Sequence, residues 1–235
     1  MSVAISLCVL VRNRPELLYE LQQNFCEKFA DLEVELVVVD NSSTQEYRNH
    51  FEQLADLYTT VTDEDLWCEG FSFAKNKAIR LASNDWVVVA DMGEVWQDNT
   101  SFRLAHAIGQ YGETTPCFRV QISAGGPDLG RVFNRKRMRL MGMVHEAPFQ
   151  RRTSTIWSVS ARRHSPVAML QHHSGGDAKY QQRKQALYDH LLDTIYRDPS
   201  RRPGTDPYWF LTHWPQRLEE GVELFTFNQW RSLLG

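Results

Sequence analysis

Two acidic residues, Asp91 and Glu94, follow an unbroken apolar stretch, residues 86–90, and are separated by Met92 and Gly93. A continuous β-branched run of this kind predicts a strand buried on both faces. Ligands of open α/β sheets bind where such strands end. Carboxylates placed there can coordinate a hard divalent cation or accept a hydrogen bond from a sugar hydroxyl. The same two residues could instead only close a turn, which Gly93 would also suit.

Asp40 closes a second apolar run, residues 34–39. Two acids at the ends of neighbouring parallel strands can hold a nucleoside, one through a base N–H and the other through a ribose hydroxyl. By itself, Asp40 is explained as well by a loop cap involving Asn41 and Thr44. The pair of Asp40 and Asp91 on one sheet edge favours a ligand site.

A cationic group precedes Asp91 on a predicted helix over residues 71–81. Lysine side chains near the end of a strand suit a diphosphate. We expect Lys77 and Arg80 to lie on a solvated helix face, and Lys75, beside Asn76, to reach the site.

Two later pairs, His145–Glu146 and His172–His173, could also carry chemistry. Glu146 could take a proton from an acceptor hydroxyl or thiol, or it could form a surface salt bridge with a nearby arginine. Adjacent histidines on a strand point to opposite faces, so at most one of the second pair faces a given site. Either histidine could be a metal ligand or a structural hydrogen-bond donor.

Strands and helices alternate over the first ninety residues. Apolar runs at residues 3–11, 34–39, 56–61 and 86–90 alternate with helical spacing at residues 15–30, 47–54 and 71–81. This order predicts an α/β fold with a doubly wound, mainly parallel sheet. Right-handed crossovers would bring Asn13, Asp40 and Asp91 to one edge, with Asn13 also a candidate helix cap.

The pattern changes after residue 99. A helix over residues 101–110, with Phe102 facing inward, leads to short strands at 118–122, 131–133 and 167–170. Three helices are then expected at 180–196, 207–220 and 224–234. We therefore predict a catalytic or binding domain over residues 1–175 and a C-terminal helical extension over residues 176–235.

Composition restricts the class of protein. The net charge of −3 gives no global attraction to nucleic acid or membranes. The four cysteines are widely spaced, and Cys8, Cys26 and Cys117 lie in apolar patterns, as expected of free thiols in a reducing compartment. With neither a signal-peptide pattern nor a membrane-spanning run, a cytoplasmic location is expected. The motifs of zinc peptidases, α/β-hydrolases, P-loop NTPases and dinucleotide oxidoreductases are absent from the sequence.

In order and spacing, four segments resemble the family 2 glycosyltransferases of the GT-A fold. These are ISLCVLVRN (5–13), VVVDNSST (37–44), FSFAKNKA (71–78) and NDWVVVAD (84–91). The later VHE (144–146) and QHH (171–173), with the trailing helices, resemble a subgroup with a small catalytic domain and a helical tail.

The resemblance implies an inverting transferase that uses a nucleotide-sugar donor, usually a UDP-sugar. It implies donor binding by Asp40 at the base, with Val11 and Asn13 beside it, and by Lys75 near the ribose or diphosphate. Asp91 becomes the first acid of the family's Asp-x-Asp motif, and Glu146 becomes the catalytic base.

The family's motif usually reads Asp-x-Asp-Glu, whereas this chain has Gly93 in place of the second aspartate. A divalent cation, Mn²⁺ or Mg²⁺, could still bind if Glu94 substitutes for that aspartate, together with Asp91 and His173. His145 and His172 are candidate ligands of the diphosphate or the metal. Alternatively, basic residues neutralise the diphosphate without a cation. A catalytically inactive nucleotide- or glycan-binding module is the alternative function.

The acceptor is not specified by these motifs and could be a glycan, a protein or a nucleic acid. A basic belt could meet a polyanionic acceptor or form a solvated β-ribbon. Its members are Arg131, Arg135, Lys136, Arg137, Arg139, Arg151 and Arg152. The aromatic-rich C-terminal segment predicts a helical core or the surface of a homodimer.

Overall fold

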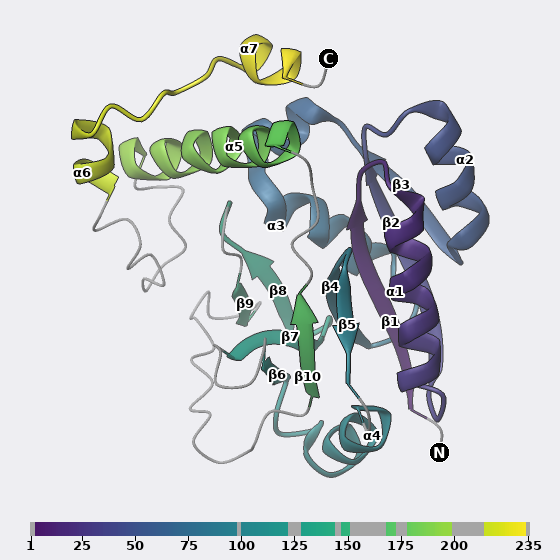
Figure 1. Cartoon of the computed structure of the whole chain (residues 1–235). Helices are drawn as coiled ribbons and strands as arrows, with labels where there is room; N and C mark the ends of the chain where they lie inside the picture. Colours follow the sequence, from purple (N-terminus) through teal and green to yellow (C-terminus); the bar gives the residue numbers. More distant parts are fainter. Residues whose placement is uncertain are drawn as a thin grey trace.

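The computed structural model describes residues 3–97, 100–121, 128–143, 147–150, 168–172, 178–198 and 214–233. Its centre is an eight-stranded sheet with the strand order β3-β2-β1-β4-β7-β6-β10-β5 (Figure 1). The parallel half consists of β1 (Ala4–Val11), β2 (Glu33–Asn41), β3 (Leu57–Val61) and β4 (Trp86–Asp91).

The other half of the sheet is mixed. It consists of β7 (Asp128–Asn134), antiparallel to β4 and β6, then β6 (Cys117–Gln121), β10 (Ala168–His172) and β5 (Glu94–Trp96). β10 is parallel to β6 and antiparallel to β5. A separate antiparallel pair is formed by β8 (Met138–Met141) and β9 (Ala147–Gln150).

Helices cover both faces of the sheet. One side carries α1 (Pro15–Lys28), α2 (Gln45–Leu54) and α4 (Thr100–Tyr111), and the other carries α3 (Asp63–Leu81), α5 (Ala178–Arg197) and α7 (Phe227–Ser232). The short α6 (Trp214–Glu219) lies at the end of α5, as Figure 1 shows. The predicted doubly wound α/β architecture is confirmed.

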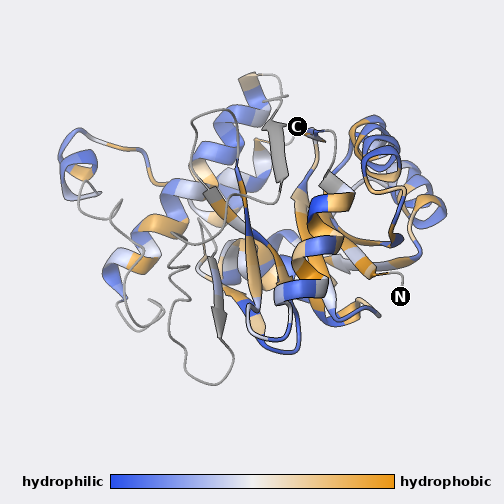
Figure 2. Cartoon of the chain, turned by 90° about the horizontal axis from the view of Figure 1, so that it is seen from below, coloured by the Kyte–Doolittle hydropathy of each residue, from blue (hydrophilic) through white to orange (hydrophobic). Residues whose placement is uncertain are grey.

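The apolar strands serve two cores because successive side chains of a strand point to opposite faces. In β4, Val87 and Val89 face the core under α3, whereas Val88 and Ala90 face the core under α1. Full burial of each such side chain stabilises the fold by about 1.5–3 kcal/mol. Figure 2 shows the resulting pattern, with apolar strands inside and polar helix faces outside.

The helix α3 differs from the helix predicted over residues 71–81. It starts eight residues earlier, at Asp63, where the Thr62 hydroxyl accepts from the Asp65 backbone N–H and the Asp65 carboxylate accepts from the Thr62 N–H. Gly70, at φ 75° and ψ −172°, interrupts the helix, so the predicted helix is its second half. The first half escaped prediction because Gly70 separates it from the apolar periodicity that follows.

Two burial predictions are wrong. Phe102 on α4 is 70% exposed, because Leu104 and Ala107 form the inward stripe of that helix. Cys26 is exposed on α1, whereas Cys8 and Cys117 are buried as expected; all four cysteines are free thiols.

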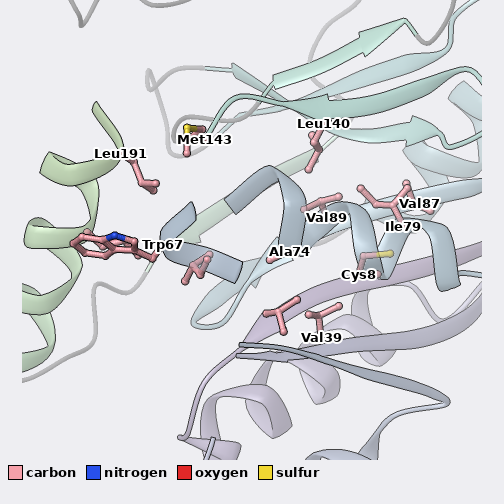
Figure 3. Close-up of a cluster of buried hydrophobic side chains, with 14 of the residues drawn as sticks. Cys8, Val39, Trp67, Ala74, Ile79, Val87, Val89, Leu140, Met143 and Leu191 are labelled. Atoms are coloured by element: carbon pink, nitrogen blue, oxygen red, sulfur yellow. The ribbon is translucent and has the colours of Figure 1, made fainter. Parts of the chain in front are cut away.

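The C-terminal helices share a core with the sheet. Figure 3 shows Leu191 of α5 and Trp67 of α3 at one end of a buried cluster that continues through Ala74 to Val89. Within the described ranges, no helix is both long and apolar enough to span a bilayer.

Candidate functional site

The ends of three parallel strands meet at one edge of the sheet. Val11 of β1 is paired with Asp40 of β2, and Leu10 of β1 is paired with Asp91 of β4. The predicted convergence of Asn13, Asp40 and Asp91 is therefore confirmed. The Val11 side chain is buried in the core, so this residue can meet a ligand only through its backbone.

The loops at this edge have an unusual backbone. Asn13 (φ 43°), Arg14 (φ 68°) and Ser42 (φ 54°) are, in the described part of the chain, the non-glycine residues with positive φ. Non-glycine residues in this region cost about 1–3 kcal/mol each and concentrate at functional sites. Asn13 does not cap α1 as expected, since Arg14 precedes that helix. Instead its backbone N–H donates to Ser43 Oγ at 2.8 Å and its Oδ1 accepts from the Thr44 N–H at 3.1 Å.

Asp40 is fully buried beneath these loops. Its Oδ1 accepts from the Ser43 hydroxyl and from the Ser43 backbone N–H at 3.1 Å. Its Oδ2 accepts from the Tyr58 hydroxyl at 3.1 Å and lies 3.5 Å from Arg48 Nε. Asp40 thus fixes the loop after β2, and only lone pairs left by these partners are available to a ligand.

Asp91 and Glu94 form a cluster with two cations. Lys75 Nζ lies 2.8 Å from Asp91 Oδ1, and Arg131 Nη2 lies 2.9 Å from Asp91 Oδ2. The same Arg131 nitrogen lies 3.0 Å from Glu94 Oε1, so it bridges the two carboxylates. Glu94 Oε2 in turn accepts from the Asp91 backbone N–H at 3.1 Å, which closes the turn at Gly93 (φ 84°).

The two carboxylates of this cluster differ in their protonation. Burial raises the pKa of Glu94, Arg131 opposes the rise and Asp91 adds to it. The resulting pKa is about 7. Burial also acts to raise the pKa of Asp91, but Lys75 and Arg131 outweigh it and hold that pKa far below its usual range. Asp91 is therefore always ionised near neutral pH, and its side chain is 36% exposed.

Arg131 was expected in a surface belt, but its side chain points into this cluster. Three other described belt members contact backbone carbonyls or a surface acid. Arg135 donates to Asn84 O, Arg137 donates to Gly112 O and Glu113 O, and Lys136 pairs with Asp85. Arg151 and Arg152 lie outside the described residues. The sequence signal for Arg131 was a charge beside buried Val132 and Phe133, because a charge in a buried strand requires a partner.

A second buried cluster joins the site edge to the C-terminal helices. Arg12, directly after β1, contacts Asp63 through Nη1 and donates from Nη2 at 3.3 Å. Arg183 of α5 donates to the same carboxylate at 3.0 Å, and burial together with Arg12 lowers the pKa of Arg183 to about 10. Asp63 and Arg183 were not predicted from the sequence, where only the helix-cap pattern starting at Thr62 marks Asp63.

The remaining predicted residues either have other partners or lie outside the described residues. The Asn76 side chain binds the backbone of Leu140. It donates to the Leu140 carbonyl at 2.7 Å and accepts from the Leu140 N–H at 3.1 Å. Lys77 donates to Thr60 O at 2.7 Å, and Arg80 is exposed. The backbone of His172 pairs with Glu94 at the end of β10. His145, Glu146 and His173 lie outside the described residues.

The described acids leave few oxygens free for Mn²⁺ or Mg²⁺. Each Asp91 oxygen already faces a cation, and Glu94 is buried behind Arg131. Hard divalent cations need several oxygen ligands at short range. In the described ranges, no group of three or more His, Cys, Asp or Glu side chains could hold a metal ion.

A parallel half-sheet with an acidic strand end, continued by mixed strands, is the architecture of GT-A glycosyltransferases. Residues 6–163 match the model of glycosyl transferase family 2. The chain therefore belongs to this family and is a glycosyltransferase. A search of curated proteins gives no match.

One solved structure, a mannosyltransferase, supports the fold, and two others are more distantly similar. A mannosyltransferase from Pyrobaculum calidifontis, in complex with GDP-Man and Mn²⁺, is 18% identical with a TM-score of 0.50, covering 94% of this chain and 71% of that one. A mycobacterial protein is 13% identical with a TM-score of 0.47, covering 87% and 76%. Glucosyl-3-phosphoglycerate synthase from Mycobacterium tuberculosis is 17% identical with a TM-score of 0.35, covering 52% and 43%.

Proposed function

We propose that the protein transfers a sugar from a nucleotide-sugar donor to a hydroxyl or thiol acceptor, with inversion at the anomeric carbon. The observation that carries this proposal is the convergence of Asn13, Asp40, Lys75 and Asp91 at one sheet edge. Open α/β sheets bind ligands at this edge. Family membership supplies the reaction class.

In the proposed reaction, the bond between the sugar C1 and the donor's phosphate oxygen breaks, and its electron pair stays on the diphosphate. The acceptor oxygen or sulfur forms the new bond to C1 from the opposite face. The acceptor proton passes to Glu146, which acts as general base. Asp40 and Asp91 hold the nucleoside, and the backbone of Val11 and the side chain of Asn13 flank it.

Calorimetric titration of the full chain with UDP and with GDP tests donor binding. UDP is the nucleotide implied by the family resemblance, whereas the similar mannosyltransferase structure contains GDP-Man. Binding of either nucleotide supports the proposal and selects the donor. Failure of both to bind would remove the donor assignment.

Replacing Glu146 with Gln tests the base. We expect nucleotide binding to be retained and donor turnover, as transfer or hydrolysis, to fall about 10²–10⁴-fold, the usual contribution of a general base. Glu113→Gln, at an exposed position, is the matched control and should keep full turnover. Turnover retained in Glu146→Gln would take this residue out of the role.

A salt titration tests the class of acceptor. If the remaining basic belt binds a polyanion, acceptor affinity should fall steeply between about 50 and 200 mM salt. An affinity that does not change with salt would argue for an uncharged glycan or protein acceptor.

A further inference from the structure

The position that a bridging metal ion would take between Asp91 and Glu94 is filled by a side chain of the protein. Arg131 Nη2 lies 2.9 Å from one carboxylate and 3.0 Å from the other. We propose that Arg131 and Lys75 act as built-in cations that bind and neutralise the donor diphosphate, so that donor binding needs no divalent metal. This inference rests on the proposed function.

The chain holds Arg131 in place from two sides. It belongs to β7, whose residue Val132 is paired with Val88 of β4, so its side chain reaches the end of β4 directly. Its Nη1 lies 3.5 Å from the Val89 carbonyl, and its side chain is only 12% exposed. A buried guanidinium with fixed partners is preorganised, so little reorganisation is needed when charge develops beside it.

Lys75 contacts the Asp91 carboxylate from the helix α3, whereas Arg131 contacts it from the sheet. It lies on the second half of α3, where neighbouring Ala74 and Ala78 are buried against the sheet. Its ammonium group meets Asp91 Oδ1 at 2.8 Å, whereas Arg131 meets Oδ2. The exposed part of the Asp91 side chain is thus flanked by two positive charges.

With both acids ionised the charges of the cluster balance, so an anion would bind through hydrogen bonds from the two cations rather than through a net positive charge. Glu94 is fully buried and compensates Arg131 from the inside. Asp91 is the more exposed of the two acids, and it orients both cations, whose own side chains are only 7% and 12% exposed. A diphosphate next to Asp91 can therefore accept charge-assisted hydrogen bonds from both cations, which are roughly twice as strong as neutral ones.

Both cations would act in the transfer step. When the C1–O bond breaks, the leaving nucleoside diphosphate gains one negative charge, while the acceptor proton moves to Glu146. A divalent ion would stabilise this charge as a Lewis acid. Here the guanidinium of Arg131 and the ammonium of Lys75 would do so by hydrogen bonding.

The first test is titration of the full chain with the nucleotide that binds, UDP or GDP, with Mn²⁺ or with a chelator. We expect dissociation constants that agree within about threefold, less than 1 kcal/mol of difference. A loss of more than about tenfold on chelation would overturn the inference but leave the proposed function standing. Failure of UDP and GDP to bind in either condition would instead overturn the proposed function.

The second test removes Arg131. Arg131→Met alone would leave Glu94 buried without its counter-charge, which can prevent folding. We therefore pair it with Glu94→Gln, which keeps the cluster neutral. In this double variant we expect diphosphate affinity to fall at least about tenfold and affinity for the corresponding monophosphate to change little.

The matched control is Arg137→Met, because Arg137 contacts only the carbonyls of the Gly112–Glu113 loop among its described partners. This control should bind the diphosphate like the wild type. Wild-type diphosphate affinity in the Arg131→Met/Glu94→Gln variant would show that Arg131 only pairs with the two carboxylates and would overturn the inference.

Discussion

Asp91 and Glu94 are three residues apart and share one arginine, yet their environments give them opposite roles. Asp91 is partly exposed and faces two cations, which keep it ionised. Glu94 is buried beside a second carboxylate, which raises its pKa to about 7, so its charged and neutral forms are both populated near neutral pH. One acid is suited to hold cations at a ligand site, and the other to balance charge within the fold.

This difference predicts a pH dependence of stability. The folded-state pKa of Glu94, about 7, lies above the ordinary value of 4.5. Its contribution to the free energy of unfolding is therefore fully present below about pH 4.5 and is lost as pH rises to about 7. We expect Glu94→Gln to remove a decline of roughly 2 kcal/mol between pH 5 and 7.5, measured by urea unfolding.

The control for this experiment is Glu113→Gln, at an exposed position. Its stability should follow the wild-type pH profile, because Glu113 is exposed and takes no part in the cluster. Parallel profiles for Glu94→Gln and the wild type would show that Arg131 holds Glu94 ionised throughout this range.

At the scale of the elements, the interruption of α3 brings the helix against the loop that follows β8. Gly70 takes a positive φ there, and the next backbone N–H, of Phe71, donates to Met143 O at 2.8 Å. A Cβ on Gly70 would lie 2.5 Å from Met143 Cα and O. No side chain fits this position, so the glycine sets the direction of the half-helix that carries Lys75.

Gly70→Ala should therefore be strongly destabilising. The strain of a non-glycine residue at positive φ and the clash with the Met143 backbone each cost about 1–3 kcal/mol, so we expect a loss of at least ~2 kcal/mol in urea unfolding. Gly109→Ala is the matched control, because no atom lies within 4 Å of its Cβ on α4. That change should be neutral or stabilise by about 0.5–1 kcal/mol. A loss below about 0.5 kcal/mol in Gly70→Ala would contradict the fixed interruption.

Sequence patterns predicted the elements better than the contacts between them. The runs that became β1, β2 and β4 were identifiable because both faces of these strands are buried, which leaves an unbroken apolar signal. β5 was missed because a three-residue strand carries no periodicity; it is held instead by Asn24, which bonds both the N–H and the carbonyl of Trp96.

The site was predictable only at the strand ends and on the predicted helix that carries Lys75. Asp40, Asp91 and Lys75 follow from the order of strands and helices together with the family's motifs. Arg131 lies 40 residues beyond Asp91, and Arg183 lies 120 residues beyond Asp63. Such pairings depend on how the mixed strands and the C-terminal helices pack, which local patterns do not encode.

At the scale of the whole molecule, the C-terminal helices are joined to the site edge by a continuous chain of contacts. Asp63 binds Arg12 on one side and Arg183 of α5 on the other. The guanidinium of Arg183 lies 4.2 Å from the ring of Trp230 in α7, whose indole N–H donates to Arg183 O at 3.0 Å. The helices therefore contribute to the same core as the sheet, although they lie beyond the family-matched residues 6–163.

This continuity predicts that the helices and the sheet unfold together. Trp230 is buried and packs 5.1 Å from Trp67 of α3, so Trp230→Ala should cost about 3–5 kcal/mol and lower the midpoint of a single transition. Far-UV circular dichroism and tryptophan fluorescence should give coincident curves. Phe102→Ala, on the exposed face of α4, should change stability by less than about 0.5 kcal/mol. Two separate transitions, with only the first shifted by Trp230→Ala, would instead show that residues 176–235 form an independent unit, because a core shared with the sheet must melt with it.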